Sequence, residues 1–101
     1  MAEGKGNAMG RVLQKYIGQP VAILCMRYWY RGLASSVEDD VLTLTDPRAV
    51  EVTGPASGST PQTEDSIPSD LHINLNAVEI VCQPAWVWAG FEDKRKGAKK
   101  A

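Results

Sequence analysis

Residues 30–46, YRGLASSVEDDVLTLTD, carry the most informative pattern in this chain. Apolar and polar residues alternate before and after the acidic run at residues 38–40, so the stretch predicts two strands joined by a turn. Gly32 lies inside the first strand, where a glycine lets the backbone coil tightly or approach another strand closely. In the second strand Leu42 and Leu44 share one side and are expected in the core. The stretch therefore predicts a strongly bent strand, an acidic turn and a second strand.

The sequence before this stretch continues the β pattern. Residues 21–37 are rich in branched and aromatic side chains and are too long for a single ordinary strand. A tight hairpin turn at Arg27 and Tyr28 would divide them, but it lacks the Asn-Gly or Gly-Gly pair typical of such turns. A long strand bent at Gly32 is the favoured alternative.

The sequence after this stretch predicts a short strand and a long loop. Residues 46–47, Asp-Pro, are expected to end the second strand, and residues 49–54, AVEVTG, to form another strand with both valines facing inward. Residues 54–70 contain three prolines, two glycines and four serines, which predicts a surface loop with little intrinsic order. Such a loop is either a tolerated insertion or a binding element.

Residues 71–82, LHINLNAVEIVC, change their inward face partway along. The apolar residues of the first half share one phase of the strand alternation and those of the second half share the other: Leu71, Ile73 and Leu75, then Val78, Ile80 and Cys82. One unbroken strand cannot do this and keep a single buried face. A single turn of tight helix or a bulge at Asn76 and Ala77 would restore it.

An amphipathic helix is predicted from Ala8 to Ile17. Its apolar residues recur at helical spacing and form one stripe: Met9, Val12, Leu13, Tyr16 and Ile17. Asn7 can cap the helix start, Gly18 suits a left-handed C-terminal residue, and Pro20 prevents continuation. The stripe is expected to grip the core.

Length and composition predict one domain. The chain has 101 residues, 44% of them apolar, which is enough for a core without disulfides or metals. We expect a single domain at residues 8–91, with flexible tails at residues 1–7 and 92–101. Residues 92–101 hold five basic and two acidic side chains, a net charge of +3, which leaves −4 for residues 1–91 out of the total of −1. The body therefore lacks the overall basic charge typical of nucleic-acid binders.

Cysteine use and hydropathy predict a cytoplasmic protein. Cys25 and Cys82 lie in apolar runs, which is typical of buried thiols in a reducing cytosol. The N-terminus shows no signal-peptide pattern. The longest apolar stretch falls far below the roughly twenty residues needed to cross a bilayer, so no membrane partner is expected.

The order of these elements resembles the small barrel of the Sm-like family, which includes the LSm and Hfq-type proteins. The likeness covers most of residues 9–82. Part of it is similar to the family's first motif, in which an apolar-apolar-glycine step ends a helix and a glycine bends the second strand: Tyr16, Ile17, Gly18, Val21, Ile23, Gly32, Val37, Leu42 and Leu44. The rest looks like the closing pair of strands: Ile73, Leu75, Val78 and Ile80. The resemblance implies an all-β fold, a strongly bent open barrel of five or six strands with a short N-terminal α-helix.

Two turns depart from the family pattern. The family places an aspartate and an asparagine in the turn after the bent strand and an arginine-glycine pair in the last turn, and together these hold an RNA base. Here the turns read VEDDVL and NLNAVE, with no asparagine in the first and no arginine-glycine pair in the second. Asp39 and Asp40 would present carboxylates to a polyanion, which opposes RNA by about 1 kcal/mol per contact at low salt.

Self-assembly is the expected mode of action. A short open barrel leaves unpaired strand edges, and here no edge carries a run of lysines or prolines that would discourage pairing. We expect a homo-oligomer, a ring in the family it resembles. Large aromatic residues near the C-terminus are candidates for the oligomer or partner interface: Trp86, Trp88 and Phe91. They are expected either in a sixth strand or in a segment that covers a barrel mouth, buried on their own barrel or on a neighbouring subunit.

Two functional classes stay open. The first is binding of single-stranded RNA by an aromatic and basic cluster, with candidate residues Arg27, Tyr28, Tyr30, Arg31 and Asn76, because aromatic faces flanked by arginines stack bases. Alternating aromatics are also typical of cross-strand packing. The second class is a protein-interaction or scaffold module without nucleic acid.

Catalysis is not expected. His72 is the only histidine, and the chain has no short ligand spacing such as C-x-x-C. Glu38 and its two acidic neighbours lie in a turn where solvent keeps carboxylates ordinary. We therefore expect no catalytic residues, metal, cofactor or small-molecule substrate.

Overall fold

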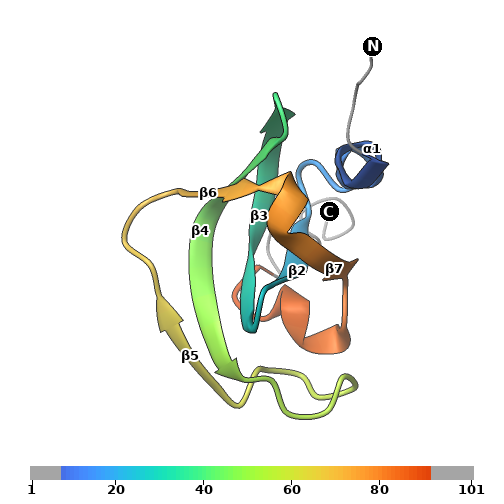
Figure 1. Cartoon of the computed structure of the whole chain (residues 1–101). Helices are drawn as coiled ribbons and strands as arrows, with labels where there is room; N and C mark the ends of the chain where they lie inside the picture. Colours follow the sequence, from blue (N-terminus) through green and yellow to red (C-terminus); the bar gives the residue numbers. More distant parts are fainter. Residues whose placement is uncertain (1–7, 92–101) are drawn as a thin grey trace, which may run out of the picture.

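The computed structural model describes residues 8–91, and Figure 1 traces the chain. The helices and strands, in chain order, are α1 (Ala8–Gln14), β2 (Pro20–Cys25), β3 (Tyr28–Glu38), β4 (Val41–Val52), β5 (Thr63–Ser66), β6 (Leu71–Asn74), the 3₁₀ helix η1 (Leu75–Ala77), β7 (Val78–Cys82) and the 3₁₀ helix η2 (Ala85–Trp88). The expected tails, residues 1–7 and 92–101, lie outside the described residues. No helix in residues 8–91 has the length and apolar character to span a membrane.

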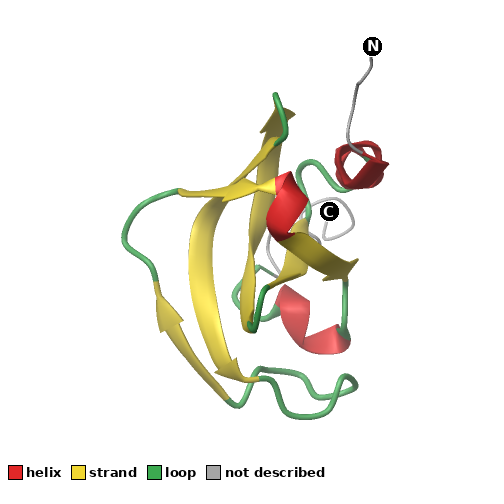
Figure 2. Cartoon of the chain, viewed as in Figure 1, coloured by secondary structure: helices red, strands yellow, loops and turns green. Residues whose placement is uncertain are grey.

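Six antiparallel strands form one strongly curved sheet, which Figure 2 shows in yellow. The order is β5-β4-β3-β2-β7, and β6 also pairs with β4. β6 pairs with residues 41–44 of β4, whereas β5 pairs with residues 48–52. Within residues 8–91, β7 on one side and β5 with β6 on the other each have one strand neighbour, so the barrel is open. The predicted small, open all-β barrel with a short N-terminal helix is confirmed.

The main core lies inside the curve of the sheet. Strands β2, β3, β4 and β6 line it, while α1 and η1 contribute one leucine each. Its buried members are Leu13, Val21, Ile23, Ala34, Leu42, Leu44, Ile73 and Leu75. Burying an aliphatic side chain of this size stabilises the fold by about 1.5–3 kcal/mol. Leu42 and Leu44 therefore face the core as predicted.

A second, smaller cluster covers the opposite face of the sheet. Ala22 and Val50 supply the sheet side, and η2 supplies Trp86 and Val87. The rings of Trp29 and Trp86 meet edge to face with their centroids 6.2 Å apart, a favoured aromatic geometry. The segment for which the sequence allows a sixth strand or a cover for the barrel mouth is therefore a 3₁₀ helix on the outer face of the sheet.

Gly32 lies close against the backbone of β4. A Cβ atom here would lie 3.1 Å from the Pro47 Cα and 3.1 Å from a backbone carbonyl oxygen of β4, so a side chain would force the backbone apart. The β3–β4 register shifts between Arg31 and Leu33, and Asp46 adopts a φ of +52°. Because this register shift accommodates the left-handed backbone at Asp46, β4 continues through Asp46 and Pro47. The predicted end of the strand there is wrong.

Residues 21–37 contain both of the features that the sequence offers as alternatives, a tight hairpin turn and an irregularity at Gly32. β2 and β3 form a hairpin, with Cys25 paired to Tyr28. The turn is Met26 and Arg27, one residue before the expected position, and Met26 adopts a φ of +60°. The single long strand is therefore wrong, although β3 itself does shift register at Gly32.

The N-terminal helix is shorter than predicted. α1 ends at Gln14, and the chain continues in turns to a left-handed Gly18 with φ +89°. Leu13 is fully buried, while Val12 and Ile17 are 41% and 37% exposed. Of the predicted stripe, Met9, Leu13 and Tyr16 pack in or against the core, whereas Val12 is exposed within the helix and Ile17 is exposed beyond its end.

Residues of β4 and β7 that are predicted to face inward do not all pack in the main core: Val52 and Ile80 are exposed, Val50 belongs to the second cluster and Cys82 packs against it. Val52 is 46% exposed. In a separate departure from the sequence prediction, the loop predicted at residues 54–70 contains strand β5. In β7, Ile80 is 43% exposed, while Val81 packs against the main core. The cause is a register shift between Leu24 and the next residue of β2, which changes the phase of β7.

Candidate functional site

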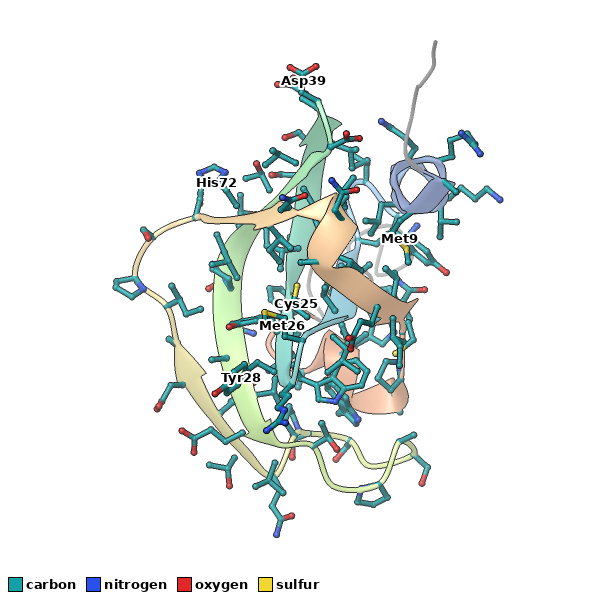
Figure 3. All side chains as sticks on the ribbon, viewed as in Figure 1. Met9, Cys25, Met26, Tyr28, Asp39 and His72 are labelled. Carbon is teal, nitrogen blue, oxygen red and sulfur yellow. The ribbon has the colours of Figure 1, made fainter. Side chains whose placement is uncertain are left out.

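The acidic turn and η1 form one end of the barrel, where Figure 3 labels Asp39. Asp39 and Asp40 join β3 to β4, and both adopt left-handed φ values of +51° and +65°. The backbone N–H of Leu75 in η1 donates to the Asp40 carbonyl oxygen at 2.8 Å. The two turns that correspond to the base-holding turns of the resembled family therefore lie side by side.

Local hydrogen bonds build η1. The Asn74 Oδ1 accepts from the backbone N–H of Asn76 at 2.9 Å, and the N–H of Val78 donates to the Leu75 carbonyl oxygen. Leu75 is buried, whereas Asn76 is exposed. The predicted turn of tight helix at Asn76 and Ala77 is confirmed. Asn76 directly follows Leu75, whose backbone N–H donates a hydrogen bond to the acidic turn.

The acidic turn gives this end of the barrel a negative surface. Glu38, Asp39 and Asp40 are all exposed. Aspartate is one of the few residues that tolerates a left-handed backbone, because its short side chain bonds locally, so these residues also suit the turn itself. Their carboxylates repel a phosphodiester chain. The arrangement is therefore unfavourable for RNA at the place where the resembled family binds it.

The β2–β3 turn exposes aromatic, apolar and basic groups together. Met26 and Tyr28 are 72% and 66% exposed, and Arg27 between them is also exposed. Figure 3 places Met26 and Tyr28 far from Asp39 along the sheet. Tyr30 is half-buried and packs against the main core. Of the predicted nucleic-acid residues in this cluster, Arg27 and Tyr28 keep the exposure that stacking or phosphate contact requires.

Arg31 is buried, with 2% of its surface exposed. Its Nε and Nη2 donate to the two carboxylate oxygens of Glu64, both at 2.7 Å. Its Nη1 donates to the carbonyl oxygens of Val87, at 3.1 Å, and Ala89. The donors of Arg31 are therefore used inside the domain, and its predicted nucleic-acid contact would have to displace these partners.

The C-terminal aromatics pack within the same chain. Trp86 and Phe91 are 3% and 1% exposed, and Trp88 is half-buried beside the second cluster. The guanidinium carbons of Arg31 and Arg48 lie 5.4 and 4.3 Å from the centre of the Phe91 ring. Of the two alternatives, burial on the chain's own sheet is the one observed. Contact of these side chains with a partner stays a prediction.

The remaining reactive groups are separate from one another. His72 is exposed on β6, with its Nδ1 3.0 Å from the Thr43 Oγ1 (Figure 3). Residues 8–91 hold no group of three or more His, Cys, Asp or Glu side chains placed to bind a metal ion. Desolvation by burial raises the pKa of the Cys25 thiol, with a smaller contribution from Glu79, and desolvation also raises the pKa of Cys82. A raised pKa lowers the thiolate fraction, so both are weak nucleophiles at neutral pH.

Sequence reasoning missed Glu64 and Arg48. Glu64 lies in a stretch whose prolines, serines and glycines predict a loop, but residues 63–66 form β5 by pairing with β4. Arg48 is directly opposite Arg31 in the β3–β4 register. One signal was available: Trp29 and Arg31 alternate with Tyr28 and Tyr30, so β3 has large side chains on both faces and needs cover on both.

No protein-family model and no curated protein sequence matches the chain. Solved structures do match it. A heptameric archaeal Sm protein is 17% identical, with 72% of this chain and 96% of that chain covered and a TM-score of 0.54. The SmAP1 heptamer of P. aerophilum is 16% identical, with 77% and 95% covered and a TM-score of 0.55. Nearly the whole of each Sm chain is therefore reproduced within this chain, and these likenesses show that the protein has an Sm-like fold.

Proposed function

We propose that the protein is a non-catalytic binding module that assembles with copies of itself into a ring. The observation that carries this proposal is the open barrel, in which β7 and the β5–β6 side each have one strand neighbour in residues 8–91. Unpaired backbone groups on such edges favour pairing with another strand. Because the two edges differ, pairing one with the other is head to tail and forms a ring when the rotation closes.

The β6 edge is the better partner for β7. β6 has four residues and β7 has five, so their lengths match. β5 carries Glu64 and Asp65 and is followed by Pro68, and charges and prolines at an edge discourage pairing. Ile80, 43% exposed on β7, would then be covered by the neighbouring copy. The heptameric state of the two similar Sm proteins supports such an arrangement.

Light scattering of the purified chain at micromolar concentration tests the assembly. We expect a mass of several subunits, and Ile80→Lys should shift it toward the monomer because a buried lysine in the interface is costly. Val12→Lys is the matched control, since Val12 is similarly exposed, at 41%, but lies on α1. A wild-type monomer, or equal effects of the two variants, contradicts the proposal.

A second candidate function is binding of single-stranded RNA at the β2–β3 turn. Tyr28, 66% exposed, and the exposed Arg27 favour it, because a base can stack on the ring while the guanidinium contacts phosphate. A gel-shift titration with short uridine-rich and adenine-rich RNA at two salt concentrations measures it. Retardation at low salt that Tyr28→Ala and Arg27→Ala weaken supports RNA binding. Absence of retardation leaves the protein-interaction or scaffold module, which we expect to work in the cytoplasm.

A further inference from the structure

We propose that edge strand β5 and residues 85–91, which cover the outer face of the sheet, form one clasp pinned by Arg31, and that the two parts open and close together. The clasp comprises residues 63–66 and 85–91. Figure 1 shows its two parts as yellow and orange segments far apart in the sequence. The clasp lies within one chain and does not depend on self-assembly.

Arg31 connects the two parts of the clasp through a single guanidinium group. One edge of the group meets Glu64 of β5 in a bidentate pair, with both nitrogen–oxygen distances 2.7 Å. Nη1 faces the other part and donates to the Val87 and Ala89 carbonyl oxygens, with the Trp86 carbonyl oxygen at 3.5 Å. Carbonyl groups at the end of a short helix lack donors from the helix itself. Arg31 thus donates hydrogen bonds to both parts of the clasp at once.

Two further contacts join the same regions. The backbone N–H of Ala85 donates to the carbonyl oxygen of Ala56, in the loop that leads into β5, at 3.0 Å. The ring of Phe91 lies against Arg48, which β4 contributes next to β5. The clasp is therefore held at its start, its middle and its end.

The buried charge makes the two parts interdependent. Arg31 is 2% exposed, and it forms an ion pair with Glu64, whose side chain is 27% exposed. If β5 leaves, a buried cation loses its carboxylate, and breaking a buried pair on one side is strongly unfavourable. If residues 85–91 leave, water reaches Arg31 and its pair with Glu64 weakens to that of an exposed pair. Opening of either part of the clasp therefore lowers the free-energy cost of opening the other part.

The clasp is separate from the main core. Trp86 and Val87 belong to the cluster on the outer face, whereas the leucines and valines of the barrel interior form the other cluster. Opening can therefore leave the barrel folded. It would also uncover residues 48–52 of β4, whose outer neighbour is β5. The closed clasp thus prevents that edge from pairing with other chains.

Hydrogen exchange of the full chain, read by mass spectrometry, tests the inference. Glu64→Gln removes the charge of the carboxylate that pairs with Arg31, and Asp65→Asn makes the same chemical change at the exposed neighbouring residue. We expect Glu64→Gln to speed exchange in residues 85–91 by about tenfold or more, with Asp65→Asn near wild type. The reporting amides are those of Val87, Ala89 and Phe91, which donate to the carbonyl oxygens of Pro84, Trp86 and Trp88.

Independent opening of the two parts would overturn the inference. If Glu64→Gln speeds exchange around residues 62–67 but leaves residues 85–91 as in the wild type, the clasp is not one unit. The variant could also expose the barrel core. In that case, hydrogen exchange of the wild-type protein at a series of low denaturant concentrations shows whether the two segments open together. Amides of the two segments that converge on one opening free energy and one denaturant slope support the clasp, and two separate values overturn it.

Discussion

The acidic turn and the arginine pair on the outer face, Arg31 and Arg48, are two groups of charges in opposite surroundings. Glu38, Asp39 and Asp40 are exposed at the end of the barrel, whereas Arg31 is buried and Arg48 has a 15% exposed side chain. The anions therefore face solvent, and the cations face the protein.

This difference shows why residue type alone is a poor guide to function. Arginines next to aromatics predicted a surface for RNA, yet the aromatics and arginines of the outer face stabilise the packing of residues 85–91. The carboxylates remain available to affect any ligand that approaches the barrel end. Burial, rather than composition, separates a charge that holds the fold from a charge that acts on a partner.

Loss of Arg31 should destabilise the protein most. Arg31→Met removes the buried cation and leaves Glu64 and the Val87 and Ala89 carbonyl oxygens without this donor. We expect the free energy of unfolding to fall by about 3–5 kcal/mol, as for other broken buried pairs, measured by urea denaturation. Arg27→Met is the control, because Arg27 is exposed in a turn and should change stability by less than about 0.5 kcal/mol. Equal effects of the two variants would erase the contrast.

A smaller effect is expected from neutralising the acidic turn. The triple variant Glu38→Gln, Asp39→Asn, Asp40→Asn removes the repulsion of phosphates from the barrel end. Apparent affinity for single-stranded RNA should rise by up to about tenfold at low salt and converge with wild type at high salt, because exposed charges are screened. Gel-shift titrations at two salt concentrations measure this. Unchanged affinity at low salt would show that RNA does not approach this end.

A substitution at Arg48 tests how much the second arginine of the outer face stabilises the fold. Its Nε is buried without a hydrogen-bond partner, and its pair with Asp46 is long, at 3.3 Å, and largely exposed on the aspartate side. Arg48→Met keeps a side chain against the Phe91 ring and removes the unsatisfied donor, so the expected loss is at most about 1 kcal/mol. Urea denaturation beside Arg31→Met measures it. A loss as large as that of Arg31→Met would mean that both arginines hold residues 85–91 equally.

The backbone of the acidic turn should respond least. Asp40 adopts a φ of +65°, and glycine adopts such a conformation without steric cost. Asp40→Gly should therefore raise the free energy of unfolding by roughly 0.5 kcal/mol, the relief of left-handed strain offset by the greater freedom of the unfolded chain. Thermal unfolding measures it, with Glu38→Gly in β3 as the control that should destabilise.

Much of the barrel could be predicted from local pattern. The alternation of Leu42 and Leu44, the phase change around Asn76 and the glycine at position 32 each depend on the residue and its near neighbours. The turn at Met26 could not be predicted, because a methionine in a left-handed conformation is exceptional and only the pairing of β2 with β3 imposes it. The position of β5 could not be predicted either, because its residues have weak strand preference and follow the edge of β4.

Local pattern was enough to predict an N-terminal helix, short bent strands and a tight turn, since periodicity and glycine position act through steric rules that hold in any context. The open barrel itself was implied by the resemblance to the Sm-like family. Which charges are available depended instead on the packing of distant segments. Whether Arg31 faces water or Glu64 depends on a contact between residues 33 positions apart, and no local rule specifies which distant segment covers a strand face. The function of this barrel therefore follows from packing as much as from residue type.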